Sequence, residues 1–352
     1  MVHALAGHHD VSTLTLGDWS PADTNAFYGT AIAPTAVHRQ VVPAPWRWLS
    51  GLRDDYLTRL RMCSVLHDAR PRAAQYDLMI SGDNFAAFAK PGIQYVYFPA
   101  WLQPPAARWK PIVDVYFAIC DRLLGAPWTD AARNTTLVTS QWTAAGLRRL
   151  GEVSNPIVLY PPVLDPGQGL PWLERDDSFL CVGRFHHTKR IETSIAIVKR
   201  VRDTVLPHAR LTIVGSPVDP AYTARIRSIA VREGDWILFR EDLSRHALNV
   251  LMGRSRYGIQ AMEGEHFGMA TAEMARAGCV VFAHHSGGSP EVLNQPSLLW
   301  TTAEDAIGGI AAVVSSRRGE QLSMQLREHA ARFSAETFVE QFRSIVSNAQ
   351  VS

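Results

Sequence analysis

The sequence is short of the features that mark disulfide-bonded, membrane-spanning and nucleic-acid-binding proteins. Its four cysteines, Cys63, Cys120, Cys181 and Cys279, stand far apart and form no Cys-x-x-Cys pair. That spacing is typical of a reducing compartment and provides no zinc site. No run of about 18 apolar residues occurs, so no transmembrane helix is predicted. The formal net charge of +2 excludes the strong basic excess of a dedicated nucleic-acid binder.

The amino terminus offers no targeting signal. Residues 1–10 lack the basic start and the apolar stretch of a secretory signal peptide. We therefore expect a cytoplasmic protein, and peripheral contact with the inner face of the membrane stays open as an addition to that expectation.

What the sequence does contain is enough apolar residues for a large core. The chain has 352 residues, 47% of them apolar and 19% charged, and this length suggests two domains or one large one. Short β-branched runs alternate with segments of helical period, which is typical of α/β proteins with parallel sheets. We expect strands at residues 11–16, 76–80, 94–98, 136–139, 178–182, 210–214, 236–239, 257–261 and 279–283. We expect helices at residues 48–69, 140–150, 191–206, 220–233, 244–251, 270–277 and 335–349.

A domain boundary is expected within residues 155–171, which read NPIVLYPPVLDPGQGLP. Prolines and glycines at this density cannot continue a helix or a central strand. We place an acceptor-side domain at residues 1–165, a second domain at 166–334, and a terminal helix at 335–352 that packs back toward the first domain. Two doubly wound domains would face a central cleft, where open parallel sheets bind ligands.

The first stretch with chemical potential is Gly183-Arg184-Phe185-His186-His187-Thr188-Lys189, between an expected strand and an expected helix. Gly183 would permit a tight turn and close approach of a ligand. Arg184 and Lys189 are cations near a helix N-terminus, where the helix dipole also favours an anion such as a diphosphate. The alternative is a solvated basic turn.

The second stretch, EGEHFGMATAEMARAG at residues 263–278, carries Glu265 and Glu273 eight positions apart. If Phe267 and Gly268 open a helix, their N–H groups point outward at a substrate. Glu265, in the loop, would then accept hydrogen bonds from sugar hydroxyls. Glu273, further along the helix, would accept hydrogen bonds from both hydroxyls of a ribose. The alternative is two carboxylates on a solvated helix face.

A third stretch, HHSGGSPE at residues 284–291, follows the last expected strand. A glycine pair after a parallel strand suits a loop at the ligand edge of the sheet, and an ordinary turn is the alternative. Neighbouring histidines such as His284 and His285 usually point apart in this position. No third ligand at metal spacing accompanies them, so no metal site is predicted.

Taken in order, these stretches resemble the donor half of the family-4, or group 1, retaining glycosyltransferases, which share the GT-B fold of two Rossmann-like domains. The shared pieces are GR with a following Lys, E-x7-E with FG after the first Glu, and the GG loop. EHFG, AEM-x-RAG, H-x-SGG and VLYPPV also resemble the α-1,2-mannosyltransferases of the dolichol-oligosaccharide type and their bacterial relatives. Those enzymes use GDP-mannose.

The resemblance implies a role for each matching residue. Arg184 and Lys189 would contact the donor diphosphate, and Glu273 would bind the ribose. Glu265, with the backbone of His266, Phe267 and Gly268, would hold the transferred sugar, and Gly183 would line the donor site. The catalytic set implied is Glu265, Arg184 and Lys189. The resemblance implies no cofactor and no metal, in keeping with the absence of an Asp-x-Asp motif from the chain.

The first half departs from the family pattern in two ways. The sequence opens near what resembles the second strand of the family, so we expect the first strand and its glycine-rich loop to be missing and the activity to be in doubt. Tyr97, in the run YVYFP, stands where the related mannosyltransferases carry a histidine. Tyrosine could hydrogen-bond an acceptor sugar but is a poor base near neutral pH.

Residues 103–128 carry a broad apolar stripe flanked by Trp109, Lys110 and Trp128. Such a stripe favours a plain core helix, and a helix at a membrane interface is the alternative.

The leading functional prediction is a mannosyltransferase acting on a lipid-linked or polysaccharide acceptor. The same fold with a UDP-hexose donor stays open, with residues 215–219 and 239–242 as candidates for contact with the base. A catalytically silent nucleotide-sugar-binding module and a nucleotide-sugar epimerase are the further alternatives.

Overall fold

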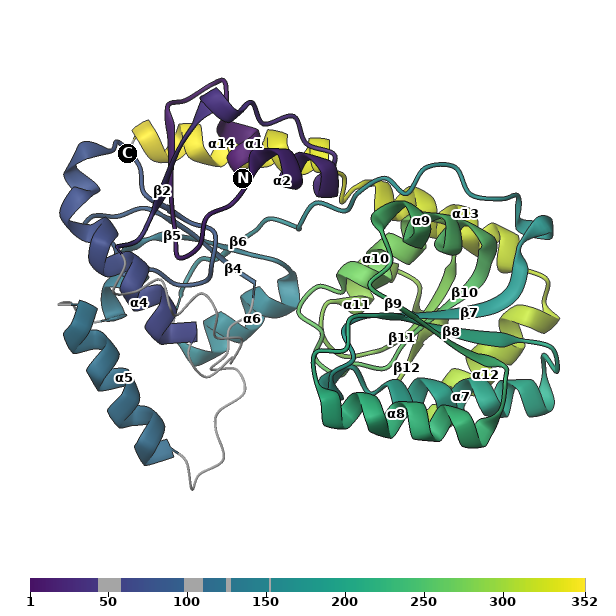
Figure 1. The fold of residues 1–352 in the computed structure, drawn as a ribbon. Helices are drawn as coiled ribbons and strands as arrows, with labels where there is room; N and C mark the ends of the chain where they lie inside the picture. Colours follow the sequence, from purple (N-terminus) through teal and green to yellow (C-terminus); the bar gives the residue numbers. More distant parts are fainter. Residues whose placement is uncertain (44–57, 98–109, 125–127, 152, 352) are drawn as a thin grey trace. The chain divides into compact units, whose positions relative to one another are not determined.

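The computed structural model describes the chain except for residues 44–57, 98–109, 125–127, 152 and 352 (Figure 1). The chain divides into two compact units. Unit 1 comprises Met1–Tyr160 and Phe338–Ser352, and unit 2 comprises Pro161–Thr337. The division at Tyr160 and Pro161 lies inside the proline-rich stretch 155–171, five residues before the boundary expected at 165.

Unit 2 is a parallel sheet with helices on both faces (Figure 1). Its strands are β7 (Asp176–Val182), β8 (Arg210–Gly215), β9 (Ile237–Glu241), β10 (Ser255–Gln260), β11 (Val280–His284) and β12 (Leu299–Trp300). Its helices are α7 (Ile191–Thr204), α8 (Pro220–Glu233), α9 (Arg245–Arg254), α10 (Met269–Arg276), α11 (Ser289–Leu293), α12 (Ala303–Ser315) and α13 (Gly319–Ala331). Short 3₁₀ turns lie at η8 (Trp172–Glu174), η9 (His187–Lys189) and η10 (Pro296–Leu298).

The strand order of unit 2 decides where a ligand can bind. The order is β12-β11-β10-β7-β8-β9, and every described pair of neighbours is parallel. The chain therefore winds outward from β7 in one direction and from β10 in the other, as in the Rossmann order. The loops that follow β7 and β10 leave the sheet to opposite faces, and they open a crevice at the switch point between the two strands.

Strand and helix boundaries in unit 2 follow from local chemistry. Asp219 caps α8 by accepting a hydrogen bond from the backbone N–H of Tyr222 at 3.0 Å, and Ser244 caps α9 through the N–H of Ala247 at 3.2 Å. Such caps satisfy N–H groups that the first helical turn leaves unpaired. The core beneath is apolar, with Phe179, Ile213 and Phe282 at most 1% exposed.

Unit 1 contains two small parallel sheets. One pairs β1 (Val11–Thr15) with β2 (Val37–Val41), and the other has the order β3-β4-β5-β6. The strands of the second sheet are β3 (Ile80–Ser81), β4 (Ile93–Val96), β5 (Thr135–Val138) and β6 (Ile157–Val158). The helices of unit 1 are α1 (Val2–Leu5), α2 (Pro21–Tyr28), α4 (Thr58–Ala69), α5 (Lys110–Leu124) and α6 (Gln141–Leu150), with turns η1 (Pro34–Ala36), η4 (Arg70–Gln75) and η7 (Trp128–Arg133).

The expected elements of the first half need several corrections. The strand predicted at 76–80 is wrong except for its last residue, because the chain enters a sheet only at Ile80 and Ser81 after the turn η4. The helix predicted at 48–69 is described from Thr58, and its earlier residues lie outside the described part of the chain. Strand β2 and helix α2 were not predicted.

The terminal helix α14 (Ala335–Val351) completes the core of unit 1. Its residues Phe338, Phe342 and Val346 lie one helical turn apart on one face. They pack in one buried cluster with Ile93, Leu137 and Leu159 of the four-stranded sheet and its edge, and with Ala4 and Leu5 of α1. The last residues of the chain are therefore part of the first folding unit.

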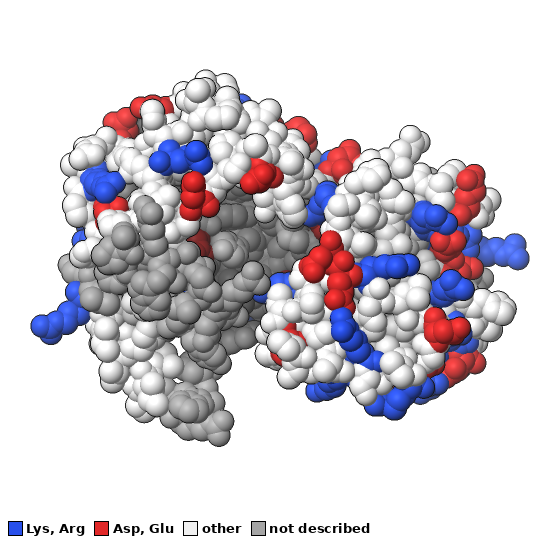
Figure 2. Space-filling model, in the orientation of Figure 1, with Lys and Arg blue, Asp and Glu red and all other residues white. Residues whose placement is uncertain are grey.

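Charged side chains of both signs are mixed on the face of the two units that Figure 2 draws. Figure 2 shows Lys and Arg interspersed with Asp and Glu on the face in view. This mixture agrees with the small net charge of +2.

Truncating the core contact of α14 tests its place in unit 1. Phe342 is fully buried, so Phe342→Ala is expected to lower the free energy of unfolding of unit 1 by about 3–5 kcal/mol, through lost burial and the cavity left behind. Chemical denaturation followed by circular dichroism measures the change. Gln341→Ala, on the exposed side of the same helix, is the matched control and should leave stability within about 0.5 kcal/mol. Equal stabilities of the two variants would contradict the packing.

Candidate functional site

The three stretches singled out in the sequence converge at the switch point of unit 2. Residues 183–189 follow β7, residues 261–268 follow β10, and residues 285–288 follow β11. All three strands are parallel neighbours, so their carboxyl ends meet at one edge of the sheet. Gln260, the last residue of β10, donates from Nε2 to the carbonyl oxygen of Val182 at 2.8 Å, which ties the two central strands where they separate.

An ion pair spans the switch point. The ammonium of Lys189, at the end of η9, lies 2.5 Å from Oε2 of Glu265 and also contacts the sulfur of Met262 at 3.2 Å. Both charged side chains are about one-fifth exposed (19% and 20%). Surface ion pairs stabilise a protein by about 1 kcal/mol or less, whereas breaking a buried pair costs about 3–5 kcal/mol, and this pair lies between the two cases. The two residues expected at the phosphate and the sugar are thus in direct contact.

The glycine pair after β11 holds the Glu265 loop by close backbone approach. A Cβ at Gly287 would lie 2.2 Å from the carbonyl oxygen of Glu265, and Gly287 has φ +84°. A Cβ at Gly288 would lie 2.7 Å from Cα of Phe267, and the N–H of Gly288 donates to the Glu265 oxygen at 2.6 Å. Side chains would separate these loops, so glycine is required at both positions. The alternative of an ordinary turn is therefore wrong.

The loop after β10 opens a helix at the point the sequence indicated. Gly268, with φ +99°, precedes α10, and no side chain caps its first N–H groups among the described residues. Phe267 is buried against the ring of Phe333, at a centroid distance of 5.2 Å, and anchors the loop. His266 is 8% exposed, and burial lowers the pKa of its imidazole. A neutral His266 ring would not compete with the Lys189 ammonium for the Glu265 carboxylate.

The second carboxylate, Glu273, lies inside α10 and is 9% exposed. Nη1 of Arg245, from the first turn of α9, donates to its Oε1 at 2.8 Å. Burial raises the pKa of Glu273 above its ordinary value, and the Arg245 guanidinium partly offsets that rise. The alternative of two carboxylates on a solvated helix face is wrong for both residues.

The remaining cation of the first stretch behaves differently. Arg184 is exposed, and no hydrogen bond or ion pair of its side chain is found in the part of the chain that the structure describes. Gly183 is not among the glycines with positive φ, and the nearest atoms that a Cβ there would meet belong to the Lys189 side chain, at 3.5 Å. The approach of a ligand expected at Gly183 stays a prediction. A close backbone approach occurs at Gly215, where a Cβ would lie 1.9 Å from the Gly183 carbonyl oxygen.

Contacts that the sequence did not reveal join the stretches of the site. Glu263 forms an ion pair with Arg190, at the start of α7, and lies 3.8 Å from Nε2 of His284. Burial lowers the pKa of His284, and the charge of Arg190 lowers it further. Arg245 was missed, and the pairing of Arg190 with Glu263 was not predicted, because each cation lies far in sequence from its carboxylate and no local spacing relates them.

The two loops proposed for contact with a base are joined. Ser216, after β8, donates from its hydroxyl to Oδ1 of Asp242, after β9, at 2.6 Å. Both residues fall within the ranges 215–219 and 239–242, next to the switch point on the β8 side of the sheet.

In unit 1, Tyr97 directly follows β4 at the carboxyl edge of its own sheet. It is 43% exposed, and its hydroxyl donates to Oδ1 of Asp83 at 2.8 Å. Burial raises the pKa of Tyr97, and Asp83 raises it further. The phenol therefore stays protonated at neutral pH and offers a hydrogen bond, in keeping with the expectation that it is a poor base.

The apolar stripe at residues 103–128 is a helix over its described part, α5. Ile112, Val115 and Ile119 are 61%, 61% and 53% exposed, whereas Cys120 is buried. Only one side of the helix therefore faces the core, against the expectation of a plain core helix. Among the described residues, no helix has both the length and the apolar character needed to cross a membrane.

Comparison with known proteins identifies the type of domain. Residues 168–333 match the family described as Glycosyl transferases group 1. Curated relatives include the GDP-Man:Man(3)GlcNAc(2)-PP-Dol alpha-1,2-mannosyltransferase of Dictyostelium discoideum, 23% identical over 229 residues, which cover 58% of this chain and 45% of that protein. The chain spans about half the length of the curated relatives it matches. The resemblance inferred from the motifs is thereby confirmed.

Solved structures agree on the fold. Sucrose-phosphate synthase from Thermosynechococcus elongatus superposes with a TM-score of 0.70 at 17% identity, covering 97% of this chain and 89% of that one. Anabaena Alr3699/HepE in complex with UDP and glucose also gives 0.70, at 14% identity, covering 98% and 94%. The predicted GT-B fold is confirmed.

The Arg245–Glu273 pair leads to a prediction about pH. A raised folded-state pKa means that Glu273 contributes stability when protonated, and that this contribution is lost as pH rises through the folded-state pKa. In Arg245→Gln that pKa rises further, so the variant should be less stable than the parent by about 2–3 kcal/mol at pH 8, and by clearly less at pH 5.

Urea denaturation at the two pH values measures the difference. Adding Glu273→Gln to Arg245→Gln removes the titrating group, so the extra pH dependence should disappear in the double variant. A stability loss that is the same at pH 5 and pH 8 would show that Arg245 does not act on the charge of Glu273.

Proposed function

We propose, from the membership of residues 168–333 in the glycosyl transferases group 1 family, that this protein is a retaining glycosyltransferase that moves mannose from GDP-mannose to a lipid-linked or polysaccharide acceptor. The observation that carries the proposal is the pairing of Lys189 with Glu265 across the switch point of unit 2. The pair supports the proposal because a cation and a carboxylate lie side by side at the edge where open parallel sheets bind their ligands.

Cations would bind the diphosphate of the donor, and carboxylates would bind its hydroxyl groups. The diphosphate carries negative charge, and Arg184 and Lys189 are the cations of the loop after β7. Glu265 would accept hydrogen bonds from hydroxyl groups of the transferred sugar. Glu273, on α10, would accept hydrogen bonds from hydroxyl groups of the ribose. When the donor binds, Lys189 has two anionic partners in reach, so the pair found here would open toward the phosphate.

The transfer step would proceed on one face of the sugar. The bond from the anomeric carbon to the phosphate oxygen breaks while the bond to the acceptor oxygen forms on the same side, and the acceptor proton passes to the departing diphosphate. Arg184 and Lys189 would stabilise the charge that develops on that leaving group. The proposal assigns no metal and no cofactor to this step, because these two cations supply the positive charge.

Glu265 would act chiefly by position. It orients the sugar through hydroxyl groups, so that the acceptor meets the anomeric carbon in a productive geometry. The backbone of Glu265 is held by a β-bridge to Gly287 and by the N–H of Gly288, which donates to its carbonyl oxygen at 2.6 Å, and this limits the movement of the loop that carries the carboxylate.

The printed names of the curated relatives support mannose and GDP, because each begins with GDP-Man. One observation favours a second donor: the Anabaena structure of the same fold contains UDP and glucose. A UDP-hexose-dependent transferase is therefore the alternative that the experiment must separate.

We also propose an acceptor and a location. The relatives' names include PP-Dol, and α5 exposes three apolar side chains, Ile112, Val115 and Ile119. Both observations favour a lipid-linked acceptor and contact with a membrane surface. We propose that the protein works in the cytoplasm, at the inner face of that membrane.

Nucleotide selectivity tests the proposal. Thermal unfolding is measured with GDP, UDP or ADP at equal concentration in the presence of a chelator. A ligand that binds only the folded state at a hundredfold excess over its dissociation constant stabilises it by about 2.7 kcal/mol. We expect GDP alone to raise the melting temperature. A rise with UDP alone would replace the donor, and no rise with any nucleotide would favour a catalytically silent protein.

A variant at the ribose position refines the test. Glu273→Gln keeps the shape of the side chain but loses the charge, and it is expected to weaken GDP binding by about tenfold, or roughly 1.4 kcal/mol, as one charge-assisted hydrogen bond is lost. Glu336→Gln, at an exposed carboxylate of α14, is the control. Unchanged GDP affinity in Glu273→Gln would contradict the ribose assignment. The anomeric configuration of the product, read by NMR, tests retention.

A further inference from the structure

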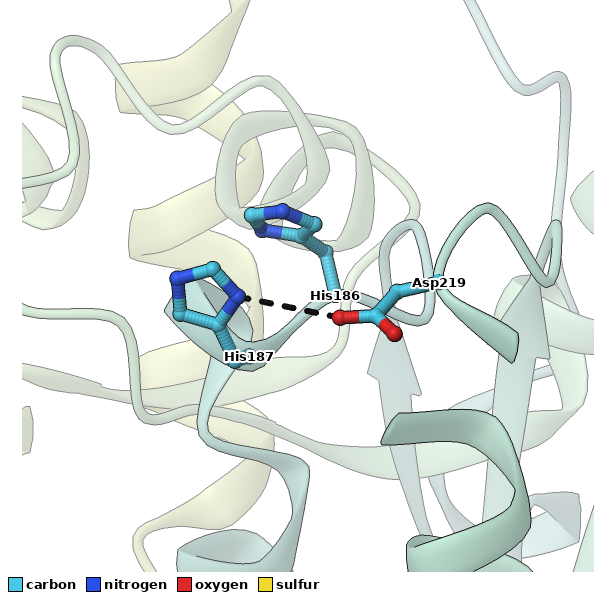
Figure 3. Close-up of side chains that lie close together, drawn as sticks. All are labelled: His186, His187 and Asp219. Atoms are coloured by element: carbon cyan, nitrogen blue, oxygen red, sulfur yellow. Dashed lines mark ion pairs between the residues drawn. The ribbon is translucent and has the colours of Figure 1, made fainter. Parts of the chain in front are cut away.

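Two neighbouring histidines from the loop after β7 and an aspartate from the loop after β8 lie close together (Figure 3). His186 and His187 lie between β7 and α7, and Asp219 lies between β8 and α8. One ring nitrogen of each histidine and one carboxylate oxygen lie within 4.8 Å of one another. His187 Nδ1 is 3.8 Å from Asp219 Oδ2, and the two imidazole rings are 4.1 Å apart between centroids.

The two loops are fixed to each other by their backbones. The N–H of Phe185 donates to the carbonyl oxygen of Ser216 at 2.8 Å, and the N–H of Asp219 donates to the carbonyl oxygen of Phe185 at 3.3 Å. The aspartate is thereby held beside the histidines, although 33 residues separate it from His186 in the sequence. This separation is why the sequence showed no metal spacing here.

Outer hydrogen bonds orient two of the three side chains. Nδ1 of His186 faces the hydroxyl of Thr188 at 2.9 Å, and Oδ1 of Asp219 accepts from the N–H of Tyr222 at 3.0 Å. The second contact turns the other oxygen, Oδ2, toward His187. Metal-binding imidazoles and carboxylates are commonly oriented by such outer partners.

We propose that His186, His187 and Asp219 form a binding site for a divalent transition metal of the zinc, cobalt or nickel type. Two imidazoles and one carboxylate are ligands that these ions accept, and three protein ligands leave a fourth position for water or another oxygen ligand.

The geometry needs only a small adjustment to receive the ion. In a tetrahedral site with metal–ligand bonds of about 2.0–2.1 Å, the ligand atoms stand about 3.3 Å apart. The His187–Asp219 distance of 3.8 Å is close to that value. His187 has a side chain that is 69% exposed, so its ring has room to turn.

The site is separate from the transfer step proposed above. Lys189 ends the same turn, η9, that begins with His187, but its ammonium points to Glu265. A bound ion would therefore hold the turn that carries Lys189 without taking the place of that cation. The inference stands whether or not the donor proposal is correct.

Zinc titration by calorimetry on the full chain, without affinity tag, tests the site. The parent is expected to bind one Zn²⁺ here, and His187→Gln and Asp219→Asn are each expected to weaken that binding at least about tenfold, since each removes one of three ligands. Asparagine also caps helices well, so Asp219→Asn keeps the start of α8. Substituting Co²⁺ gives the strong visible absorption of a four-coordinate site.

The matched control is His38→Gln. His38 lies in unit 1, with its Nε2 3.2 Å from Oδ1 of Asp10, and lines one pocket with His8 and His9, so it is a histidine beside a carboxylate away from the proposed site. Its substitution should leave the zinc affinity unchanged. Loss of binding in His38→Gln, parent-like binding in both His187→Gln and Asp219→Asn, or no binding by the parent would overturn the proposal.

Discussion

The arrangement of the loops at the switch point of unit 2 depends on the ion pair between Lys189 and Glu265. The pair forms because β7 and β10 are neighbours in the sheet, so the loops that follow them both begin at the switch point. Lys189 and Glu265 lie on these two loops, 76 residues apart in the sequence. Each of the two charged side chains is about one-fifth exposed. Removing one partner would leave the other charge unpaired and partly buried, and the free-energy cost of that state exceeds the stabilisation that a surface ion pair provides. The strand order thus brings together a cation and a carboxylate that a nucleotide-sugar would separate and use.

The surroundings of the pair restrict its movement through backbone contacts. Gly287 and Gly288 let one loop lie against the other at distances that no side chain permits, and Phe267 anchors the same loop in the core. Arg245 reaches Glu273 from another helix and partly offsets the rise in the pKa of Glu273 that burial causes. In the proposed function, stability and donor binding depend on the same contacts, so substitutions here are expected to affect both.

Local patterns in the sequence predicted the strands β7 to β11 and the helices α7 to α10 of unit 2 because these elements are regular, whereas α11, α12, α13 and β12 were not predicted. Helix α8 was expected at its observed bounds, and β7, β8 and β11 within two residues at each end. Unit 1 was harder, since β3 and β6 have two residues each and leave no periodic signal. Within the site, motifs identified Lys189, Glu265 and Glu273. The Arg245–Glu273 pair, the Arg190–Glu263 pair and the link from His187 to Asp219 arise from tertiary packing. The stretch 284–291 was placed at the correct edge, whereas the close backbone approach at Gly215 was not predicted.

The central claim is that Lys189 holds the diphosphate and Glu265 the sugar of one donor bound at the switch point. Calorimetric affinities for GDP and for GDP-mannose, measured on the parent, Lys189→Met and Glu265→Gln, test it most directly. The account predicts that Lys189→Met weakens both ligands and that Glu265→Gln weakens GDP-mannose while leaving GDP close to the parent value. Parent-like affinity of both variants for both ligands would contradict it, because the pair would then lie outside the donor site.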